Sequence, residues 1–323
     1  MAASRFPAGG GVACLACAAL LAGCGFGAGS ASEGNASLLV TRDYGAETIA
    51  DATVDNPPES ETVIRLLDSN AEITTRYGGG FVQSIEGIEG AVADGRSHDW
   101  FFYVNGVESE VGAAEAPVRG GDRVWWDYRD WTAAMRVPAV VGSFPEPFLQ
   151  ASSAGEAAEP EPVEVACAGG PNPCEAAAAA LREAGADARV VEARAASGDA
   201  PAVLVGPWSE IDGEPAARLV AQGPQASGVF VESGAEGLAA LDRSGAQARS
   251  LAPADGLIAA TRVADGQPIW IITGEAPAGV ERAAAALDEA TLARRYAVVV
   301  PSAGGAGDGG EAVALPLDAG EGP

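Results

Sequence analysis

The sequence predicts an α+β domain over residues 37–131, followed by an α/β domain over 163–300. The first prediction rests on short alternating apolar runs interrupted by a single helical run. The second rests on apolar runs that alternate with Ala-rich helical runs, as in a sheet covered by helices. A Pro- and Glu-containing connector over 132–162 separates the two, and the length of 323 residues suits about two domains.

Residues 1–23 have the features of a secretory signal peptide. Their apolar run, Val12 to Ala22, is shorter than the span of about 20 residues that a permanent membrane helix needs. It ends in Leu-Leu-Ala-Gly-Cys over 20–24, which resembles the lipobox of bacterial lipoproteins. The resemblance implies acylation of Cys24 and anchoring at the extracellular face of the cytoplasmic membrane. An ordinary cleaved signal peptide is the alternative.

The first domain follows a linker over 24–36 that is rich in Gly, Ser and Ala. Val63, Leu66 and Leu67 stand at helical spacing, and Asn105-Gly106 is a strong hairpin turn signal. The predicted elements are strands 38–44 and 48–54, helix 62–70, and strands 73–77, 81–85, 100–104 and 124–131. Two strands, one helix and then further strands favour a β-grasp-like domain, in which the basic order is ββαββ.

Aromatic residues are concentrated at the end of this domain, where residues 99–131 hold four of the six Trp. The alternation of side chains along a strand divides the last run between two faces. One face carries Trp126 and Tyr128, and the other carries Trp125, Arg129 and Trp131. Because a small domain can bury one face, we expect the second face to be partly exposed and to contact a ligand or partner. Burial of the whole run in the core is the alternative.

Three segments of the first domain resemble the C-terminal β domain of intrinsic factor and transcobalamin. They are Gly-Gly-Phe-Val-Gln-Ser-Ile over 79–85, Trp-Phe-Phe-Tyr-Val-Asn-Gly over 100–106, and Gly-Asp-Arg-Val-Trp-Trp-Asp-Tyr over 121–128. The resemblance covers residues 37–131 and implies a β-grasp or SLBB-like fold, with cobalamin or another corrinoid as a candidate ligand. The residues expected to contact the ligand are Gly79, Phe81, Trp125, Arg129 and Trp131.

The second domain is predicted to alternate strands and helices. The expected strands are 163–166, 189–193, 202–205, 227–232, 257–263, 269–273 and 296–300, and the expected helices are 174–184, 215–222 and 277–290. Asp265-Gly266 indicates a hairpin between two of these strands. Residues 301–323 are rich in Gly, Ala and acidic residues and predict a disordered tail.

Cysteine usage agrees with an oxidising compartment. Outside the cell, Cys167 and Cys174 are expected to form a disulfide that closes a loop rich in Gly and Pro. Two thiols alone make a poor zinc site, since zinc usually takes four ligands. We therefore expect no metal.

Charge and motifs exclude several function classes. The net charge of −26, with Arg as the only basic residue, disfavours binding to nucleic acid and to anionic lipid. His98 stands beside Ser97 and Asp99, but sequence neighbours rarely form a catalytic relay. We find no metalloprotease, phosphate-loop or nucleophile-elbow motif. The turns holding Trp208, Ser209 and Glu275 are weaker candidates, as ligand sites at strand ends.

Together these observations predict a non-catalytic lipoprotein that needs no cofactor. We expect it to bind a ligand or partner, as an accessory to corrinoid or nutrient uptake beside a transporter or another envelope partner. The alternative is a structural, protein-binding or glycan-binding lipoprotein of the cell envelope. An enzyme in the α/β domain is the least favoured reading.

Overall fold

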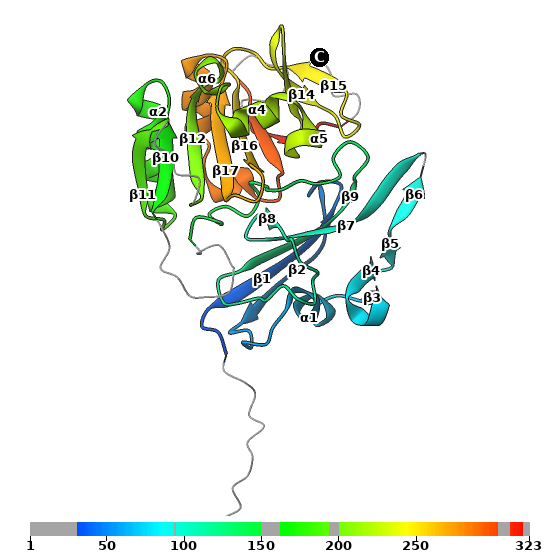
Figure 1. The fold of residues 1–323 in the computed structure, drawn as a ribbon. Coiled ribbons are helices and arrows are strands. Elements are labelled where there is room, and N and C mark those ends of the chain that lie inside the picture. The colour runs from blue at the N-terminus through cyan, green and yellow to red at the C-terminus, as the bar shows by residue number, and fades with distance from the viewer. Residues whose placement is uncertain (1–30, 94, 150–161, 194–199, 303–310, 319–323) are drawn as a thin grey trace, which may run out of the picture.

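The computed structural model describes residues 31–93, 95–149, 162–193, 200–302 and 311–318. Strands dominate, and they form two large sheets, one in the N-terminal half (31–131) and one in the C-terminal half (162–318) (Figure 1). Within the described ranges, no helix has the length and apolar character needed to cross a membrane. Cys24 and the signal peptide predicted before it lie outside the described residues, so acylation of Cys24 stays a prediction.

The sheet of the N-terminal half has two parallel strands at its centre, β1 (Asn35–Arg42) and β9 (Arg123–Asp130). β2 (Glu47–Asp55) pairs antiparallel with β1, and β7 (Arg96–Val104) pairs antiparallel with β9. The order is β2-β1-β9-β7-β6, in which β6 (Ala91–Ala93) is an edge strand. β1, β2, β7 and β9 overlap the predicted strands 38–44, 48–54, 100–104 and 124–131, and β6 was not predicted.

A tight turn joins β7 to β8 (Val107–Glu108). Its two central residues are Asn105 and Gly106, and both have positive φ, as a type I′ hairpin turn requires. The turn predicted from this dipeptide is therefore confirmed.

One face of this sheet is covered by α1 (Val63–Asp68), which is shorter than the helix predicted over 62–70. Val63, Leu66 and Leu67 are the buried residues of α1, and they pack in one core with Leu38, Val40 and Trp126 of the sheet. A separate small sheet contains β3 (Ile73–Arg76), β4 (Phe81–Ile85) and β5 (Ile88–Glu89). The turn η1 (Tyr77–Gly79) connects β3 to β4.

The C-terminal half is built on a seven-stranded sheet in the order β11-β10-β12-β17-β16-β18-β19. Four strands are parallel, namely β11 (Ala188–Glu192), β10 (Val163–Cys167), β12 (Ala202–Pro207) and β17 (Pro268–Gly274). The antiparallel strands β16 (Gly256–Arg262), β18 (Ala297–Val300) and β19 (Val313–Leu315) complete the sheet. The hairpin predicted around Asp265-Gly266 is β16–β17.

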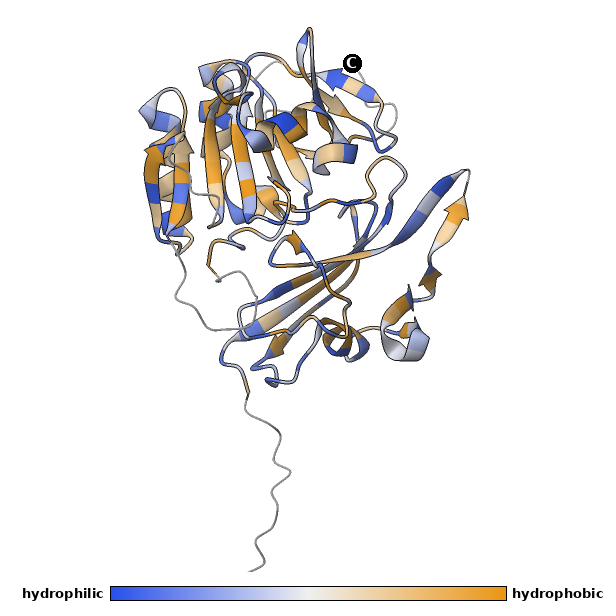
Figure 2. Ribbon diagram, in the orientation of Figure 1, coloured by the Kyte–Doolittle hydropathy of each residue, from blue (hydrophilic) through white to orange (hydrophobic). Residues whose placement is uncertain are grey.

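Helices cover both faces of this sheet, so its strands are buried and apolar (Figure 2). On one face lie α2 (Pro171–Glu183) and α6 (Pro277–Ala285), which pack with Val165, Val203 and Trp270. On the other face lie α3 (Trp208–Ile211) and α4 (Pro215–Ala221), which pack with Leu204 and Ile271. The α/β class predicted for this half agrees with this arrangement.

A disulfide joins Cys167, the last residue of β10, to Cys174 in the first turn of α2, with 5.7 Å between the Cα atoms. The predicted pairing is therefore confirmed. The bond ties the start of α2 to the strand that precedes it.

Several elements differ from the prediction. The strand expected over 227–232 begins only at β13 (Val231–Gly234), because α5 (Pro224–Ser227) and Gly228 occupy its first half. β14 (Gly237–Leu241) and β15 (Gln247–Ser250) were not predicted, and they complete a second small sheet. The helix expected over 277–290 ends at Ala285, and α7 (Glu289–Leu292) follows as a separate turn.

The tail predicted as disordered over 301–323 is partly ordered where the structure describes it. Leu315 and Leu317 are buried, and β19 pairs with β18. The prediction is wrong here because this segment carries apolar side chains that the C-terminal half can bury. The connector is also packed in its first part, where Phe144 and Phe148 lie on the ring of Trp270, with centroids 5.9 and 5.0 Å away.

Candidate functional site

Both faces of β9 are buried, so the predicted division into a core face and a contact face is wrong for most of its residues. Trp126 packs in the core of the N-terminal half and stacks on Phe102, with centroids 4.8 Å apart. On the opposite face, Trp125 is 2% exposed and Arg129 is 0% exposed. The C-terminal half covers that face, and neither side chain is available to a ligand.

Trp125 belongs to an aromatic cluster drawn from both halves of the chain. Its ring centroid lies 5.8 Å from that of Tyr103 and 5.3 Å from that of Tyr296. Tyr44 contacts Tyr296 and Phe230 at 5.1 and 5.2 Å, in edge-to-face geometry. Such pairs stabilise beyond the area that they bury. The aromatic face that predicted a ligand site therefore joins the two halves of the molecule.

Asp127 lies at the centre of this contact and is fully buried. Its carboxylate accepts hydrogen bonds from Thr41 Oγ1 at 2.6 Å, from the backbone N–H groups of Tyr44 and Gly45 at 3.0 and 3.1 Å, and from the Tyr296 hydroxyl at 3.0 Å. Burial raises the pKa of Asp127 to about 6, although these hydrogen bonds favour the charged form. Asp127 thus links residues of both halves through one carboxylate.

Arg129 has a structural role as well. Its guanidinium lies 3.8 Å from the ring centroid of Phe101, a cation–π contact. Nη1 and Nη2 donate to the carbonyl oxygens of Ala134 and Met135, at 2.6 and 3.1 Å. Arg129 therefore fixes the segment that leaves β9 toward the C-terminal half.

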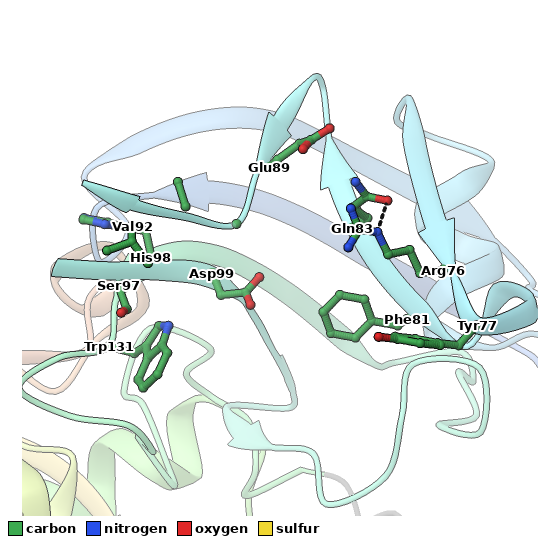
Figure 3. Close-up of a pocket in the computed structure, with 12 residues that line it drawn as sticks. Arg76, Tyr77, Phe81, Gln83, Glu89, Val92, Ser97, His98, Asp99 and Trp131 are labelled. Atoms are coloured by element: carbon green, nitrogen blue, oxygen red, sulfur yellow. Dashed lines mark hydrogen bonds between the residues drawn. The ribbon is translucent and has the colours of Figure 1, made fainter. Parts of the chain in front are cut away.

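The other predicted contact residues lie at an open groove on the N-terminal half (Figure 3). The groove has a volume of about 490 Å³ and runs between the small sheet β3-β4-β5 and the strands β6 and β7. Phe81 lines one side, and Trp131 lines the other. Gly79 lies next to the groove in η1, two residues before Phe81. The structure thus separates these three residues from Trp125 and Arg129.

The groove collects exposed apolar side chains. Tyr77, Phe81 and Val92 are 88%, 45% and 76% exposed, and they are three of the five large hydrophobic residues exposed in the described chain. The rings of Tyr77 and Phe81 meet edge to face, with centroids 6.3 Å apart. Clustered exposed hydrophobic residues mark interaction sites more often than scattered ones. We call this feature the aromatic groove, defined by Tyr77, Phe81, Val92, Asp99 and Trp131.

Tyr77 and Val92 were missed by the sequence reasoning. Tyr77 directly precedes the triple Gly78-Gly79-Gly80, of which only Gly79 was predicted as a contact residue. An aromatic residue beside a run of Gly was the available signal. Val92 lies in β6, a strand too short to show a period in the sequence.

Polar side chains lie between the aromatic ones. Arg76 Nε donates to Gln83 Oε1 at 2.5 Å, and Asp99 Oδ1 accepts from the backbone N–H of Trp100 at 2.8 Å. Figure 3 shows the Asp99 carboxylate pointing into the space between Trp131 and Phe81. Hydrogen-bond donors and acceptors therefore alternate with apolar rings along the groove.

His98 also lines the groove, and its ring stacks on Tyr128 with centroids 5.8 Å apart. Across the described residues, no hydrogen bond joins His98 to Ser97 or Asp99. Nor does any group of three or more His, Cys, Asp and Glu side chains in the described ranges form a metal site. The arrangement can bind a molecule by stacking and hydrogen bonding.

The weaker candidates of the C-terminal half have structural positions. Trp208 is buried, and its Nε1–H donates to Ser233 Oγ at 3.1 Å. Glu275 Oε1 accepts from the backbone N–H of Leu238 at 2.6 Å. Ser209 lies exposed at the start of α3.

Comparisons with known proteins cover part of the chain. Residues 60–130 match the family described as "Domain of unknown function (DUF4430)". No curated protein matches the chain. Among solved structures, a "putative metal binding protein" from Ruminococcus gnavus is similar at 15% identity and a TM-score of 0.24, over 30% of this chain and 98% of that chain. The family match runs from α1 to the end of β9 and contains every residue of the aromatic groove except Trp131.

Proposed function

We propose that this protein is a lipid-anchored component of the cell envelope that binds a ligand or partner, without catalysis, in the aromatic groove. The observation that carries the proposal is the gathering of exposed apolar side chains around one groove. Elsewhere in the described chain, the large aromatic residues of the first sheet are used in packing. An exposed aromatic surface costs solvation free energy, so its concentration at one place supports a binding role.

A β-grasp-like fold for the N-terminal half is part of the proposal. Its support is the pair of parallel central strands, β1 and β9, flanked by antiparallel β2 and β7. The single helix α1 follows the first hairpin and covers one face, as the order ββαββ requires. The resemblance to the β domain of intrinsic factor and transcobalamin agrees with this order.

The membrane anchor rests on the lipobox pattern that ends at Cys24. The disulfide Cys167–Cys174 supports an oxidising location outside the cytoplasm. We expect Cys24→Ser to prevent incorporation of radiolabelled palmitate and to release the protein from the membrane fraction. Cys14→Ser is the matched control and should stay membrane-bound. Release of both variants, or of neither, would contradict the anchor.

Uptake of a corrinoid is one version of this function. Burial of Trp125 and Arg129 leaves Gly79, Phe81 and Trp131 as the predicted contacts that a ligand can reach. Calorimetric titration of the full-length chain with cyanocobalamin tests this version. Heat of binding that is lost in Phe81→Ala would support it, and the absence of heat at high ligand concentration would exclude the corrinoid.

A structural or interaction role in the envelope is the second candidate. The polar side chains Arg76, Gln83 and Asp99 in the groove favour it, because a polar partner surface can replace the water that these groups lose on binding. In this case, capture from envelope extracts by the wild-type chain, but not by Phe81→Ala, identifies the partner.

A further inference from the structure

We infer that the aromatic groove binds a glycan chain, a ligand with flat apolar ring faces and many hydroxyl groups. The inference rests on the proposed function, because it names the ligand class of the same groove. It follows from three features of the groove: the placement of its aromatic rings, the backbone at Tyr77, and the mixture of polar groups.

The aromatic rings are placed for stacking. Tyr77 and Phe81 lie on one side of the groove and Trp131 lies on the other, with open space between them (Figure 3). A sugar ring presents C–H groups on its flat faces, and an aromatic ring can cover that face. Rings on both sides of an open groove allow an extended chain to be held at more than one of its units.

The turn η1 presents Tyr77 to the solvent at the end of the hairpin β3–β4. Tyr77 has φ 55°, in the left-handed region that non-Gly residues rarely adopt, and Gly78 and Gly79 continue it with φ 76° and 98°. Tyr77 is 88% exposed, and its ring meets that of Phe81 edge to face. No atom lies within 4 Å of where a Cβ would stand on Gly78, Gly79 or Gly80, so the space beside Tyr77 is open. The turn therefore places an exposed ring next to Phe81, where an external ligand can stack on it.

The polar side chains suit hydroxyl groups, which both donate and accept hydrogen bonds. Arg76 and Gln83 supply donors on the side of Phe81, and their mutual hydrogen bond orients them. Asp99 and Glu89, which both line the groove, supply carboxylate acceptors. A purely apolar ligand would desolvate these groups without pairing them. A glycan satisfies both the rings and the polar groups.

Binding of the purified full-length chain to an immobilised array of bacterial and plant oligosaccharides tests the inference. We expect retention on at least one glycan, and calorimetry with that soluble oligosaccharide should then give its affinity. Tyr77→Ala and Trp131→Ala should each weaken binding by about tenfold, since each removes a stacking ring. Tyr77→Phe keeps the ring and should bind nearly as the wild type does. Met135→Ala, which removes an exposed apolar side chain outside the groove, is the matched control.

The outcomes separate the glycan from the proposed function. Absence of retention on every glycan, or glycan binding that Tyr77→Ala and Trp131→Ala leave unchanged, overturns the inference. If cyanocobalamin or a captured envelope protein then binds in a manner sensitive to Phe81→Ala, the groove remains the binding site and only the glycan is wrong. Circular dichroism of each variant establishes that it is folded, and Tyr77→Ala is expected to fold because its ring is exposed.

Discussion

At the scale of single residues, the most unusual group is the carboxylate of Asp127. A fully buried charge is costly, and here four hydrogen bonds from Thr41, Tyr44, Gly45 and Tyr296 offset part of that cost. Desolvation remains the larger effect, so the pKa rises from the ordinary 3.8 to about 6. The alternation of β9 placed Asp127 on the same face as Trp125, but nothing in the sequence showed that a second layer would cover it.

Asp127 should make stability depend on pH. Because its pKa is higher in the folded state than in the unfolded state, the folded state binds the proton more tightly between pH 4 and 6. The stabilisation that protonated Asp127 gives the folded state is complete below about pH 4 and is lost as the pH rises through 6. The free energy of unfolding changes by roughly 3 kcal/mol over this range. We expect urea unfolding of Asp127→Asn to show a weaker decline between pH 4 and 7 than the wild type. Parallel pH profiles for the two proteins would contradict this assignment.

At Gly45 the backbones of the two halves approach each other closely. It has φ +84°, and a Cβ there would lie 2.0 Å from the carbonyl oxygen of Arg294. We expect Gly45→Ala to lower the free energy of unfolding by at least about 2 kcal/mol, through backbone strain and this clash. Gly87 is the matched control, because it has φ +75° with no atom within 4 Å of its Cβ position. Gly87→Ala should cost about 1 kcal/mol. If Gly45→Ala and Gly87→Ala lower the free energy of unfolding equally, the contact between residue 45 and Arg294 is not tight.

At the scale of elements, the sequence predicts best where one physical signal acts alone. β10, β12, β16 and β17 are apolar runs with both faces buried, and they were placed to within a few residues. β14 was missed because Gly-Leu-Ala-Ala-Leu lacks β-branched residues and has no clear period. β19 was missed because three apolar residues in a segment rich in Gly and acidic residues form a strand only by pairing with β18.

The link between β10 and α2 should contribute measurably to stability. A disulfide between Cys167 and Cys174 closes a short loop and restricts the unfolded chain. We expect Cys167→Ala/Cys174→Ala to lose about 2–3 kcal/mol in urea unfolding. If the loss of stability comes from the disulfide, the wild type in excess reductant should have the same lowered urea midpoint as the double variant. An unchanged midpoint in both experiments would contradict a stabilising disulfide.

At the scale of the whole molecule, one of the hydrophobic cores is built from both halves of the chain. Tyr44, Tyr103 and Trp125 of the N-terminal half pack with Phe230 and Tyr296 of the C-terminal half. The sequence predicted the two sheets separately. It left two alternatives for the aromatic face of β9, burial in a core or contact with a ligand or partner. Its burial could not be predicted, because it depends on a complementary surface more than 100 residues later in the chain. The groove residue Phe81 was proposed on the resemblance, and its partners became visible only in three dimensions.

Shared packing predicts cooperative unfolding. We expect far-ultraviolet circular dichroism and tryptophan emission to report one coincident urea transition, because neither half can expose its side of the contact alone without loss. Tyr296→Ala should lower the stability seen by both probes by roughly 3–5 kcal/mol. Tyr77→Ala, on the exposed groove, is the control and should leave the transition in place. Two separate transitions, with only one shifted by Tyr296→Ala, would show that the halves unfold independently.

The burial of the tryptophans gives the molecule an intrinsic optical reporter. Trp100, Trp125, Trp126, Trp208 and Trp270 are all buried, whereas Trp131 is partly exposed and lines the groove. A collisional quencher such as acrylamide therefore reaches one indole more readily than the other five. A molecule that occupies the groove protects this indole and shifts its emission, so occupancy can be followed in the unlabelled protein by light alone.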